Sequence, residues 1–260
     1  MRKSIINLNN LTQKQVWLTS YTVPIAELAD KHVDVILVGD SLSMVLYGME
    51  STLQADLDLM IRHGRAVVNS TKNAMIVVDM PFGSYQQDKS QAYKNASKIL
   101  RKTNCQAIKL EGGTEMQETV EFLTQRAIPV AGHIGLKPQY VNQMGGYKVQ
   151  GSNEKDKLKI IEDAKAIEKA GAFCIIVEGV KKDLADELAD IIKIPLIGIG
   201  ASNACAGQVL VAEDMLGFGL GKKAKFVKQY ANLSETIDTA FKEYAEEVKT
   251  CDFPDEKHVY

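Results

Sequence analysis

The sequence has few of the residues that mark proteins held together by disulfides or metals. Its 260 residues include four cysteines, Cys105, Cys174, Cys205 and Cys251, and none of them forms a Cys-x-x-Cys pair. Such wide spacing predicts reduced thiols in a cytosolic compartment, with no redox or metal role. A chain of this length buries roughly three quarters of its unfolded surface, so it needs no disulfide or metal merely to fold.

Long apolar runs are also missing. The longest, such as residues 173–177 and 194–199, have the length of a strand and fall far short of a membrane span. The first residues carry Arg2 and Lys3 but turn polar before an apolar stretch can form, so no targeting segment is expected. We therefore predict a cytoplasmic protein.

An excess of charge of one sign is lacking as well. The chain has 31 Lys+Arg against 33 Asp+Glu, a formal net charge of -2. Nucleic acids and anionic membranes attract strongly basic faces, so we expect neither as a partner and favour small molecules. A small cationic cluster is interpreted as a solvated face, and it consists of Lys222, Lys223, Lys225 and Lys228.

What the chain does have is a regular succession of short apolar runs, most without the polar alternation of half-exposed strands. The runs span residues 16–21, 35–38, 75–78, 107–110, 129–134, 174–177, 195–199 and 209–211. They are typical of parallel strands covered on both faces, and helical patterns lie between most of them. Eight βα units indicate a closed TIM (β/α)8 barrel, because an open doubly wound sheet more often stops at five to seven strands.

No linker or shift in composition divides the chain, so we predict a single barrel domain over residues 1–260. A last helix is expected over about residues 232–249, where Leu233, Ile237 and Phe241 share a face, followed by a short polar tail. That helix either closes the bottom of the barrel or packs on another subunit. Residues 42–54 and 141–156 are predicted to be long loops at the catalytic face that act as lids.

Ionisable residues stand where five consecutive apolar runs end. Asp40 and Asp79 follow the second and third runs, Lys109 and Glu111 belong to the end of the fourth, and the fifth and sixth end at His133 and Glu178. In a barrel these strand ends converge on one mouth, which is where active sites of this fold lie.

Each of these residues also has a plain structural interpretation. A single Asp at a strand end is often a helix cap or a turn residue, a Lys-x-Glu pair is often a solvated edge pair, and a single His is often a structural hydrogen-bond partner. Five such strand ends in succession favour a functional site, since every buried charge needs a partner.

Three or more carboxylates with at most one His and no Cys predict a hard, oxygen-rich site. Such a site suits Mg²⁺ or Mn²⁺ better than zinc, with water and substrate oxygens completing the octahedron. Lys109 beside it would neutralise an anionic substrate, and Glu178 is placed to move a proton. A metal that chelates an oxo group and a neighbouring carboxylate, together with a base, is suited to forming an enolate.

Two other features of the sequence are weaker indications of a binding site. The turn at residues 198–201 is similar to phosphate-binding turns of other barrels, but it lacks the Gly-x-Gly-x-x-Gly pattern, and close backbone approach explains it as well. His63 lies within a predicted helix, so we interpret it as structural.

Several segments, taken together and in order, resemble the ketopantoate hydroxymethyltransferase family. They are residues 38–42, 79–85, 108–113, 132–139, 145–151, 197–201, 207–211 and 214–217. The resemblance runs from about Thr19 to Tyr230. One such motif alone would be weak, but the combination is highly specific.

The resemblance implies a TIM barrel of the phosphoenolpyruvate/pyruvate type and a step of pantothenate and coenzyme A biosynthesis. In that step a hydroxymethyl group passes from 5,10-methylenetetrahydrofolate and water to 3-methyl-2-oxobutanoate by way of a Mg²⁺-stabilised enolate. The products are 2-dehydropantoate and tetrahydrofolate. The resemblance also implies a large homo-oligomer, a decamer built as a pentamer of dimers.

Carried over residue by residue, the resemblance implies that Asp40 and Asp79 bind Mg²⁺ and lie against the substrate. Glu111 is then a third metal ligand, direct or through water.

The same resemblance implies that Ser41 and Lys109 hold the carboxylate and oxo group of the substrate. It places His133 in the outer shell of the site and makes Glu178 the proton acceptor.

Two other functions were considered. The first is a Mg²⁺-dependent lyase or mutase that acts on a 2-oxo acid in the same barrel superfamily. It is disfavoured because those enzymes commonly carry a Cys-containing catalytic loop. In this chain no cysteine precedes Cys105, and none lies between Cys105 and Cys174. The second is a non-catalytic barrel, which would require the strand-end acids to be lost, and they are present.

Overall fold

The computed structural model describes residues 2–219 and 224–260. It divides the chain into two compact units, Met1–Val211 and Ala212–Tyr260. The single domain expected over residues 1–260 stays a prediction. Lys222 and Lys223 of the expected cationic cluster lie outside the described residues.

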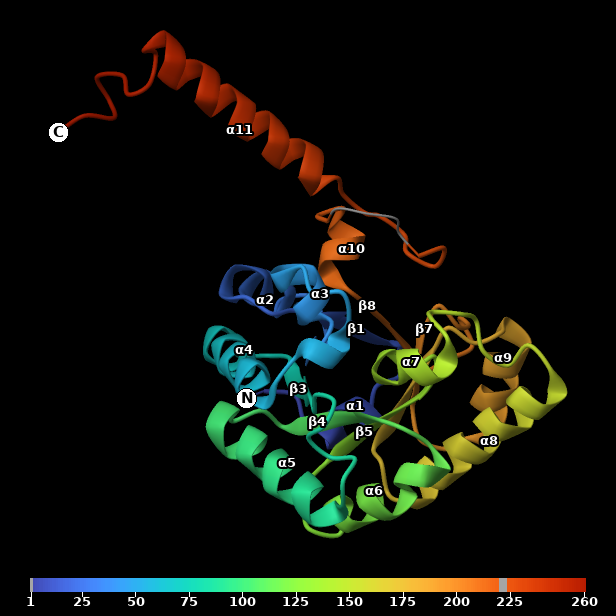
Figure 1. The fold of residues 1–260 in the computed structure, drawn as a ribbon. Coiled ribbons are helices and arrows are strands. Elements are labelled where there is room, and N and C mark those ends of the chain that lie inside the picture. Colours follow the sequence, from blue (N-terminus) through green and yellow to red (C-terminus); the bar gives the residue numbers. More distant parts are fainter. Residues whose placement is uncertain (1, 220–223) are drawn as a thin grey trace. The chain divides into compact units, whose positions relative to one another are not determined.

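The first unit is a closed barrel of eight parallel strands, in which each strand pairs with the next and the eighth pairs with the first (Figure 1). The strands are β1 Gln15–Thr19, β2 Val35–Val38, β3 Met75–Asp79, β4 Ala107–Glu111, β5 Val130–Gly135, β6 Cys174–Glu178, β7 Leu196–Ile199 and β8 Gly207–Leu210. The predicted (β/α)8 barrel is confirmed, and every predicted run agrees with its strand to within two residues at each end.

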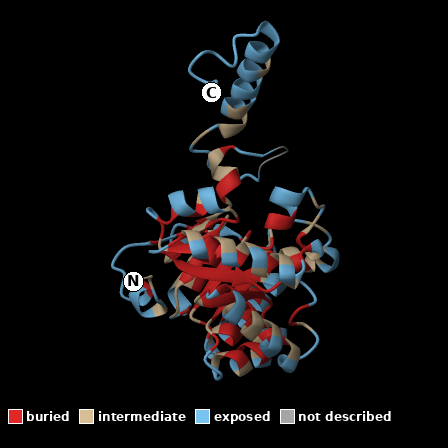
Figure 2. Ribbon diagram, turned by 90° about the vertical axis from the view of Figure 1, so that its left-hand side faces the viewer, coloured by how far each residue is buried: buried red, intermediate tan, exposed pale blue. Residues whose placement is uncertain are grey.

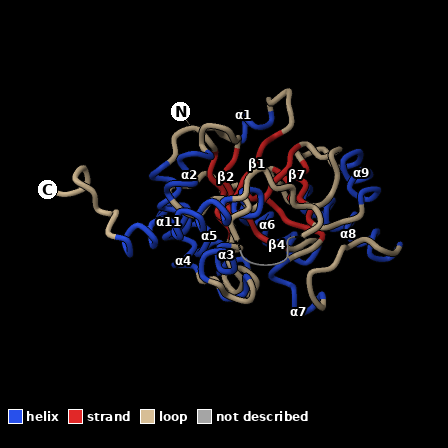
Figure 3. The backbone as a smooth tube through the Cα atoms, turned by 90° about the horizontal axis from the view of Figure 1, so that it is seen from above, coloured by secondary structure: helices blue, strands red, loops and turns tan. Residues whose placement is uncertain are grey.

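Helices surround the strands of this unit (Figure 3). They are α1 Ile5–Asn9, α2 Val23–Ala29, α3 Leu42–Tyr47, α4 Leu57–Ser70, α5 Lys89–Thr103, α6 Gln117–Thr124, α7 Val141–Met144, α8 Glu154–Lys169 and α9 Lys182–Ile191. Three short 3-10 helices accompany them, η1 Thr52–Gln54, η2 Thr114–Met116 and η3 Pro138–Tyr140.

The strands separate two apolar layers, because successive side chains of a strand point to opposite faces. One set, which includes Val35, Val77 and Ala107, fills the inside of the barrel. The alternate set, which includes Ile36 and Val78, packs against the helices. Figure 2 shows the strands as the buried centre of the unit. The inward-facing set determines which side chains reach the mouth of the barrel.

The two segments predicted to be loops are partly helical. Residues 42–54 contain α3 and η1, and residues 141–156 contain α7 and the first turn of α8. Gly48 and Gly145, in the left-handed conformation with φ of 64° and 66°, end the two short helices. Both segments were predicted to be loops, but Gly48 and Gly145 act as helix C-caps.

The second unit contains α10 Ala212–Leu216 and α11 Leu233–Thr250. The helix α11 occupies the stretch in which a last helix was expected. Within the described ranges, no helix is both long and apolar enough to cross a membrane.

Asp30, at the end of α2, fixes the segment that enters β3. Its carboxylate accepts hydrogen bonds from the backbone N–H groups of Lys72 (2.8 Å), Asn73 (3.0 Å) and Ala74 (2.7 Å). Burial alone would raise the pKa of Asp30, but these backbone hydrogen bonds outweigh it and hold the pKa below its ordinary value of 3.8.

We expect Asp30→Asn to lower the free energy of unfolding by about 1–3 kcal/mol at pH 7, because buried N–H donors lose a charged acceptor. The folded pKa lies below the unfolded one, so the stabilisation is present above the unfolded pKa and is lost as the pH falls through the folded pKa. Urea denaturation at pH 7 and pH 3 measures both effects. Glu27→Gln, on an exposed part of α2, is the matched control, and an equal loss in both variants would contradict the account.

Candidate functional site

All seven residues singled out at the strand ends lie around one cavity of about 100 Å³ at the carboxyl ends of the strands. They are Asp40, Ser41, Asp79, Lys109, Glu111, His133 and Glu178. Five of them continue the inward-facing set of their strands, and Asp40 and Ser41 lie in the segment between β2 and α3. Aliphatic side chains complete the wall, among them Leu37, Ile176 and Val209.

Lys109 pairs with Asp79 because the two residues are register partners on neighbouring strands. The Lys109 Nζ atom lies 2.9 Å from Asp79 Oδ2, and both side chains are almost fully buried. Burial opposes the charge of Lys109, but the adjacent carboxylates of Asp79, Glu111 and Asp40 outweigh it and raise the pKa of the ammonium group. Lys109 therefore carries its charge at neutral pH.

Asp40 completes the acidic centre of the cavity. Its backbone N–H donates to Asp79 Oδ2 (3.0 Å), and its own Oδ2 accepts a hydrogen bond from the side-chain amide of Gln139 (2.8 Å). Burial, and then the nearby charge of Asp79, raise the pKa of Asp40 well above its ordinary value. When both carboxyl groups are ionised, the pair carries more negative charge than Lys109 alone offsets.

His133 lies between two carboxylates. Its Nδ1 is 3.4 Å from Glu111 Oε1, which is on the register partner of His133, and its Nε2 is 3.2 Å from Glu178 Oε2. Neither contact has the geometry of a hydrogen bond. Burial and Lys109 lower the pKa of His133, but the two carboxylates outweigh them, so the pKa is raised.

Neighbouring groups lower the pKa of Glu111 although burial opposes its ionisation. His133, Lys109 and the backbone N–H of Gln139 together stabilise its carboxylate. The Gln139 N–H donates to Glu111 Oε2 at 2.9 Å. Glu178 is more accessible, with 17% of its side chain exposed.

Sequence reasoning missed three residues of this region. Gln139 and Tyr85 stand in segments that carry the family resemblance, but they follow the strand ends by several residues and had no expected role. Thr52 also lines the cavity, and its buried hydroxyl has no hydrogen-bond partner among the described residues. An ionisable residue directly at a strand end indicates a site residue, but this pattern does not extend to side chains that lie several residues beyond the strand.

The donor set of the cavity is compatible with a divalent cation. Asp40 and Asp79 are adjacent carboxylates, and Asp79 Oδ1 is buried and accepts no hydrogen bond from the described residues. In the described part of the chain, no three His, Cys, Asp or Glu side chains are grouped so as to hold a metal ion among them. Two carboxylates with water and substrate oxygens form a frequent Mg²⁺ site, so the pair is sufficient.

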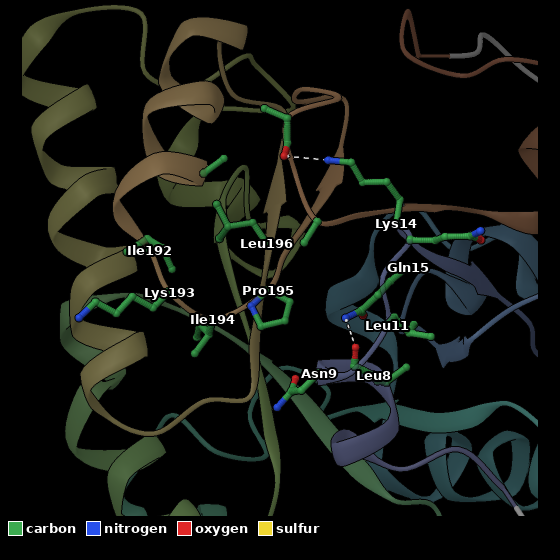
Figure 4. A pocket seen from close by; sticks show the side chains of 14 residues that line it. Leu8, Asn9, Leu11, Lys14, Gln15, Ile192, Lys193, Ile194, Pro195 and Leu196 are labelled. Carbon is green, nitrogen blue, oxygen red and sulfur yellow. Dashed lines mark hydrogen bonds between the residues drawn. The ribbon is translucent and has the colours of Figure 1, made fainter.

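A second cavity, of about 400 Å³, lies at the opposite, amino-terminal ends of β1 and β7 (Figure 4). Lys14, one of its two lysines, donates to the backbone carbonyls of Ala204 (3.0 Å) and Cys205 (2.6 Å), and Gln15 donates to the carbonyl of Leu8 (3.3 Å). These two side chains thus bind the backbone. The acids of the first cavity have no counterpart among its lining residues, so the carboxyl-terminal cavity is the candidate site.

Known proteins are similar to this chain along almost its whole length. The model of a family described as ketopantoate hydroxymethyltransferase matches residues 2–256. The 3-methyl-2-oxobutanoate hydroxymethyltransferase of Sinorhizobium fredii is 54% identical over 94% of this chain and 90% of the relative. That of Brucella canis is 53% identical over 94% of this chain and 89% of the relative.

Solved structures resemble the fold. Phosphonopyruvate hydrolase has a TM-score of 0.63 at 13% identity, covering 99% of this chain and 93% of that chain. A complex of that enzyme with oxalate and Mg²⁺ has a TM-score of 0.58 at 13% identity, covering 94% and 88%. The structure of 2,3-dimethylmalate lyase, of the PEP mutase/isocitrate lyase superfamily, has a TM-score of 0.60 at 14% identity, covering 98% and 87%. These likenesses show the fold alone.

We expect Lys109→Met to lower the free energy of unfolding of the metal-free protein by about 3–5 kcal/mol, because it leaves buried carboxylates without their ammonium partner. Lys98→Met is the control, since the Lys98–Asp58 pair (2.9 Å) is exposed and contributes less than about 1 kcal/mol. Urea denaturation compares the two variants. A cost for Lys109→Met no larger than that of the control would show that Lys109 does not offset the acidic centre.

Proposed function

The chain belongs to the ketopantoate hydroxymethyltransferase family, and we propose that it uses Mg²⁺ and 5,10-methylenetetrahydrofolate for the transfer. Its relatives at 53–54% identity carry the name of the enzyme that transfers a hydroxymethyl group to 3-methyl-2-oxobutanoate, a step of pantothenate biosynthesis. A lyase or mutase activity is not favoured, because the structural relatives that have it, such as the lyase at 14% identity, share only the fold.

The observation that carries the proposal is the pair of carboxylates at the mouth of the barrel. Asp79 has a buried oxygen without a hydrogen bond, and Asp40 lies beside it with a raised pKa caused first by burial and then by Asp79. A divalent cation would offset this repulsion. Asp40 and Asp79 would hold Mg²⁺ directly, and Glu111, whose Oε2 is held by the Gln139 N–H, would hold it through water.

When bound, Mg²⁺ supplies a Lewis acid that polarises the 2-oxo group of the substrate. Lys109, charged and directed into the cavity, binds the substrate carboxylate and oxo oxygens together with Ser41. The Ser41 hydroxyl shares a hydrogen bond of 2.8 Å with the Tyr21 hydroxyl, which orients it at the rim. The aliphatic wall is suited to the branched carbon chain of the substrate, and the cavity of about 100 Å³ is the size of a small acid. The folate therefore approaches from the mouth.

Glu178 takes the proton from C3 of the substrate, which gives the enolate. Water adds to the methylene carbon of the folate and both carbon–nitrogen bonds of that carbon break, which releases tetrahydrofolate and a one-carbon unit at the formaldehyde level. The enolate carbon bonds to this unit, and its oxygen takes the proton back from Glu178 to become the hydroxyl group. Of the four acids around the cavity, Glu178 lies farthest along the strand order from Asp40, on β6, so it is free to serve as a base. His133 lies 3.2 Å from Glu178 Oε2 and stabilises the carboxylate as an outer-shell residue. The positive charge of Lys109 stabilises the negative charge that develops on the enolate oxygen.

The protein acts as a homo-oligomer in the cytoplasm, a decamer built from five dimers as the family resemblance implies. Apolar side chains at helical spacing on α11, Phe241, Tyr244 and Val248, are 70%, 59% and 45% exposed in the single chain. An exposed apolar stripe of this kind supports burial against another subunit.

Deuterium exchange at C3 tests the metal and the base together. We expect the Mg²⁺-loaded protein in D₂O to exchange the C3 hydrogen of 3-methyl-2-oxobutanoate without folate, because Glu178 removes that proton before the carbon attacks. Proton NMR follows the exchange, and chelation of the metal should abolish it. With 5,10-methylenetetrahydrofolate added, 2-dehydropantoate should appear. If metal-replete protein gives no exchange and no product, the proposal is refuted.

Substitutions distinguish the role of the base from that of the metal ligands. Glu178→Gln should slow C3 exchange by about 100-fold or more, because it removes a general base, while Mn²⁺ affinity stays unchanged. Asp79→Asn should weaken Mn²⁺ binding itself. Glu187→Gln, a half-buried residue of α9 that pairs with Lys157 away from the cavity, is the matched control. Loss of Mn²⁺ binding in Glu178→Gln would instead make Glu178 a metal ligand.

A further inference from the structure

Gln139 occupies a position from which it reaches the ends of four strands. It lies in η3, directly after β5, and only 4% of it is exposed. The chain turns into this segment at Gly135, where φ is 85° and a Cβ atom would lie 2.4 Å from the carbonyl oxygen of Glu178. Only glycine fits this turn, so the placement of Gln139 is built into the backbone.

The side-chain amide of Gln139 uses all of its hydrogen-bonding capacity. Its nitrogen donates to Asp40 Oδ2 (2.8 Å) and to the Met80 carbonyl (2.9 Å). Its oxygen accepts from the Tyr85 hydroxyl (2.6 Å) and from the Gln86 amide (3.1 Å). The reversed amide would bring its oxygen against two acceptors, so the network allows one orientation.

The backbone of Gln139 and the hydroxyl of Tyr85 extend the network to β4. The Gln139 N–H donates to Glu111 Oε2 (2.9 Å), and the Glu111 N–H donates to the Tyr85 hydroxyl (3.1 Å). Gln139, a single residue in the segment that follows β5, thus joins the segments after β2 and β3 to the end of β4. A residue that merely anchored its own loop would not need to contact one acid with its side chain and a second with its backbone N–H.

The two carboxylates of the proposed cation site share one pattern. Asp79 Oδ2 accepts from Lys109 Nζ (2.9 Å) and from the Asp40 N–H (3.0 Å), and its Oδ1 accepts nothing from the described residues. Asp40 Oδ2 accepts from Gln139. In each case protein donors hold one oxygen, which orients the carboxylate and leaves the other oxygen for a ligand.

We infer that Gln139 is a positioning residue of the cation site, which orients the Asp40 carboxylate and is itself held by Tyr85. The inference rests on the proposed function, because it concerns how tightly the chain holds the divalent cation. Partners that orient metal ligands typically change metal affinity by 10–100-fold when they are removed.

Mn²⁺ binding to the metal-free protein, followed by the EPR signal of free Mn²⁺, tests the inference without an activity assay. Gln139→Leu should weaken binding by about 10–100-fold, and Gln139→Met, which keeps the length of the side chain, should do the same if the leucine variant does not fold. Tyr85→Phe keeps the donor to Asp40, so it should weaken binding by a smaller factor. Thermal unfolding of each metal-free variant accompanies the titration.

Gln87→Leu is the matched control, since Gln87 is exposed in the same segment and its side chain bonds to Asp88 and Gln91 rather than to Gln139 or Asp40. It should bind Mn²⁺ as the unsubstituted protein does. If the unsubstituted protein binds no Mn²⁺, the proposed function and this inference both fail. If it binds Mn²⁺ and the Gln139 variants bind equally well, or weaken only as much as Gln87→Leu, the inference alone is wrong.

Discussion

Repulsion among four buried or half-buried carboxylates is the constraint on which the site depends. Asp40, Asp79, Glu111 and Glu178 surround one cavity of about 100 Å³, where few waters can screen them and each charge interacts more strongly than in water. Lys109 is a cationic partner within this cavity, and the raised pKa of His133 favours its cationic form. Lys109 pairs with Asp79, and His133 lies between Glu111 and Glu178. The excess of negative charge that remains at Asp40 and Asp79 is what a divalent cation would offset.

The barrel produces this arrangement through its register. Asp79 and Lys109 are partners across β3 and β4, and Glu111 and His133 are partners across β4 and β5. Because side chains alternate, the same inward-facing set that fills the barrel with Val77 and Ala107 becomes ionisable two residues further on, at Asp79 and Lys109. For the site residues that belong to strands, the transition from apolar core to reactive cavity therefore requires no special loop. It needs only polar residues at the last inward-facing positions of neighbouring strands.

The sequence was sufficient to predict the barrel and the residues around the cavity, because apolar strand runs and the residues that end them are local signals. Other features depend on contacts between distant segments. Gln139 follows β5 by four residues and binds Asp40, which lies 99 residues earlier in the chain. No spacing rule indicates that contact. The helices α3 and α7 were missed for a different reason, since each is a short helix that ends at a glycine cap within a segment predicted to be a loop. The roles of the individual site residues, the metal, the folate and the oligomer stay proposals.

The central claim is that Asp40 and Asp79 form the cation site and that Lys109 and Gln139 orient them by holding one oxygen of each. Anomalous diffraction from crystals grown with Mn²⁺ tests it most directly. The account predicts one strong peak in the carboxyl-terminal cavity, within coordination distance of an oxygen of Asp40 and of Asp79 Oδ1, with Gln139 still donating to Asp40 Oδ2. A peak coordinated by His133 and Glu178 instead, or a cavity without a peak at saturating Mn²⁺, would contradict it.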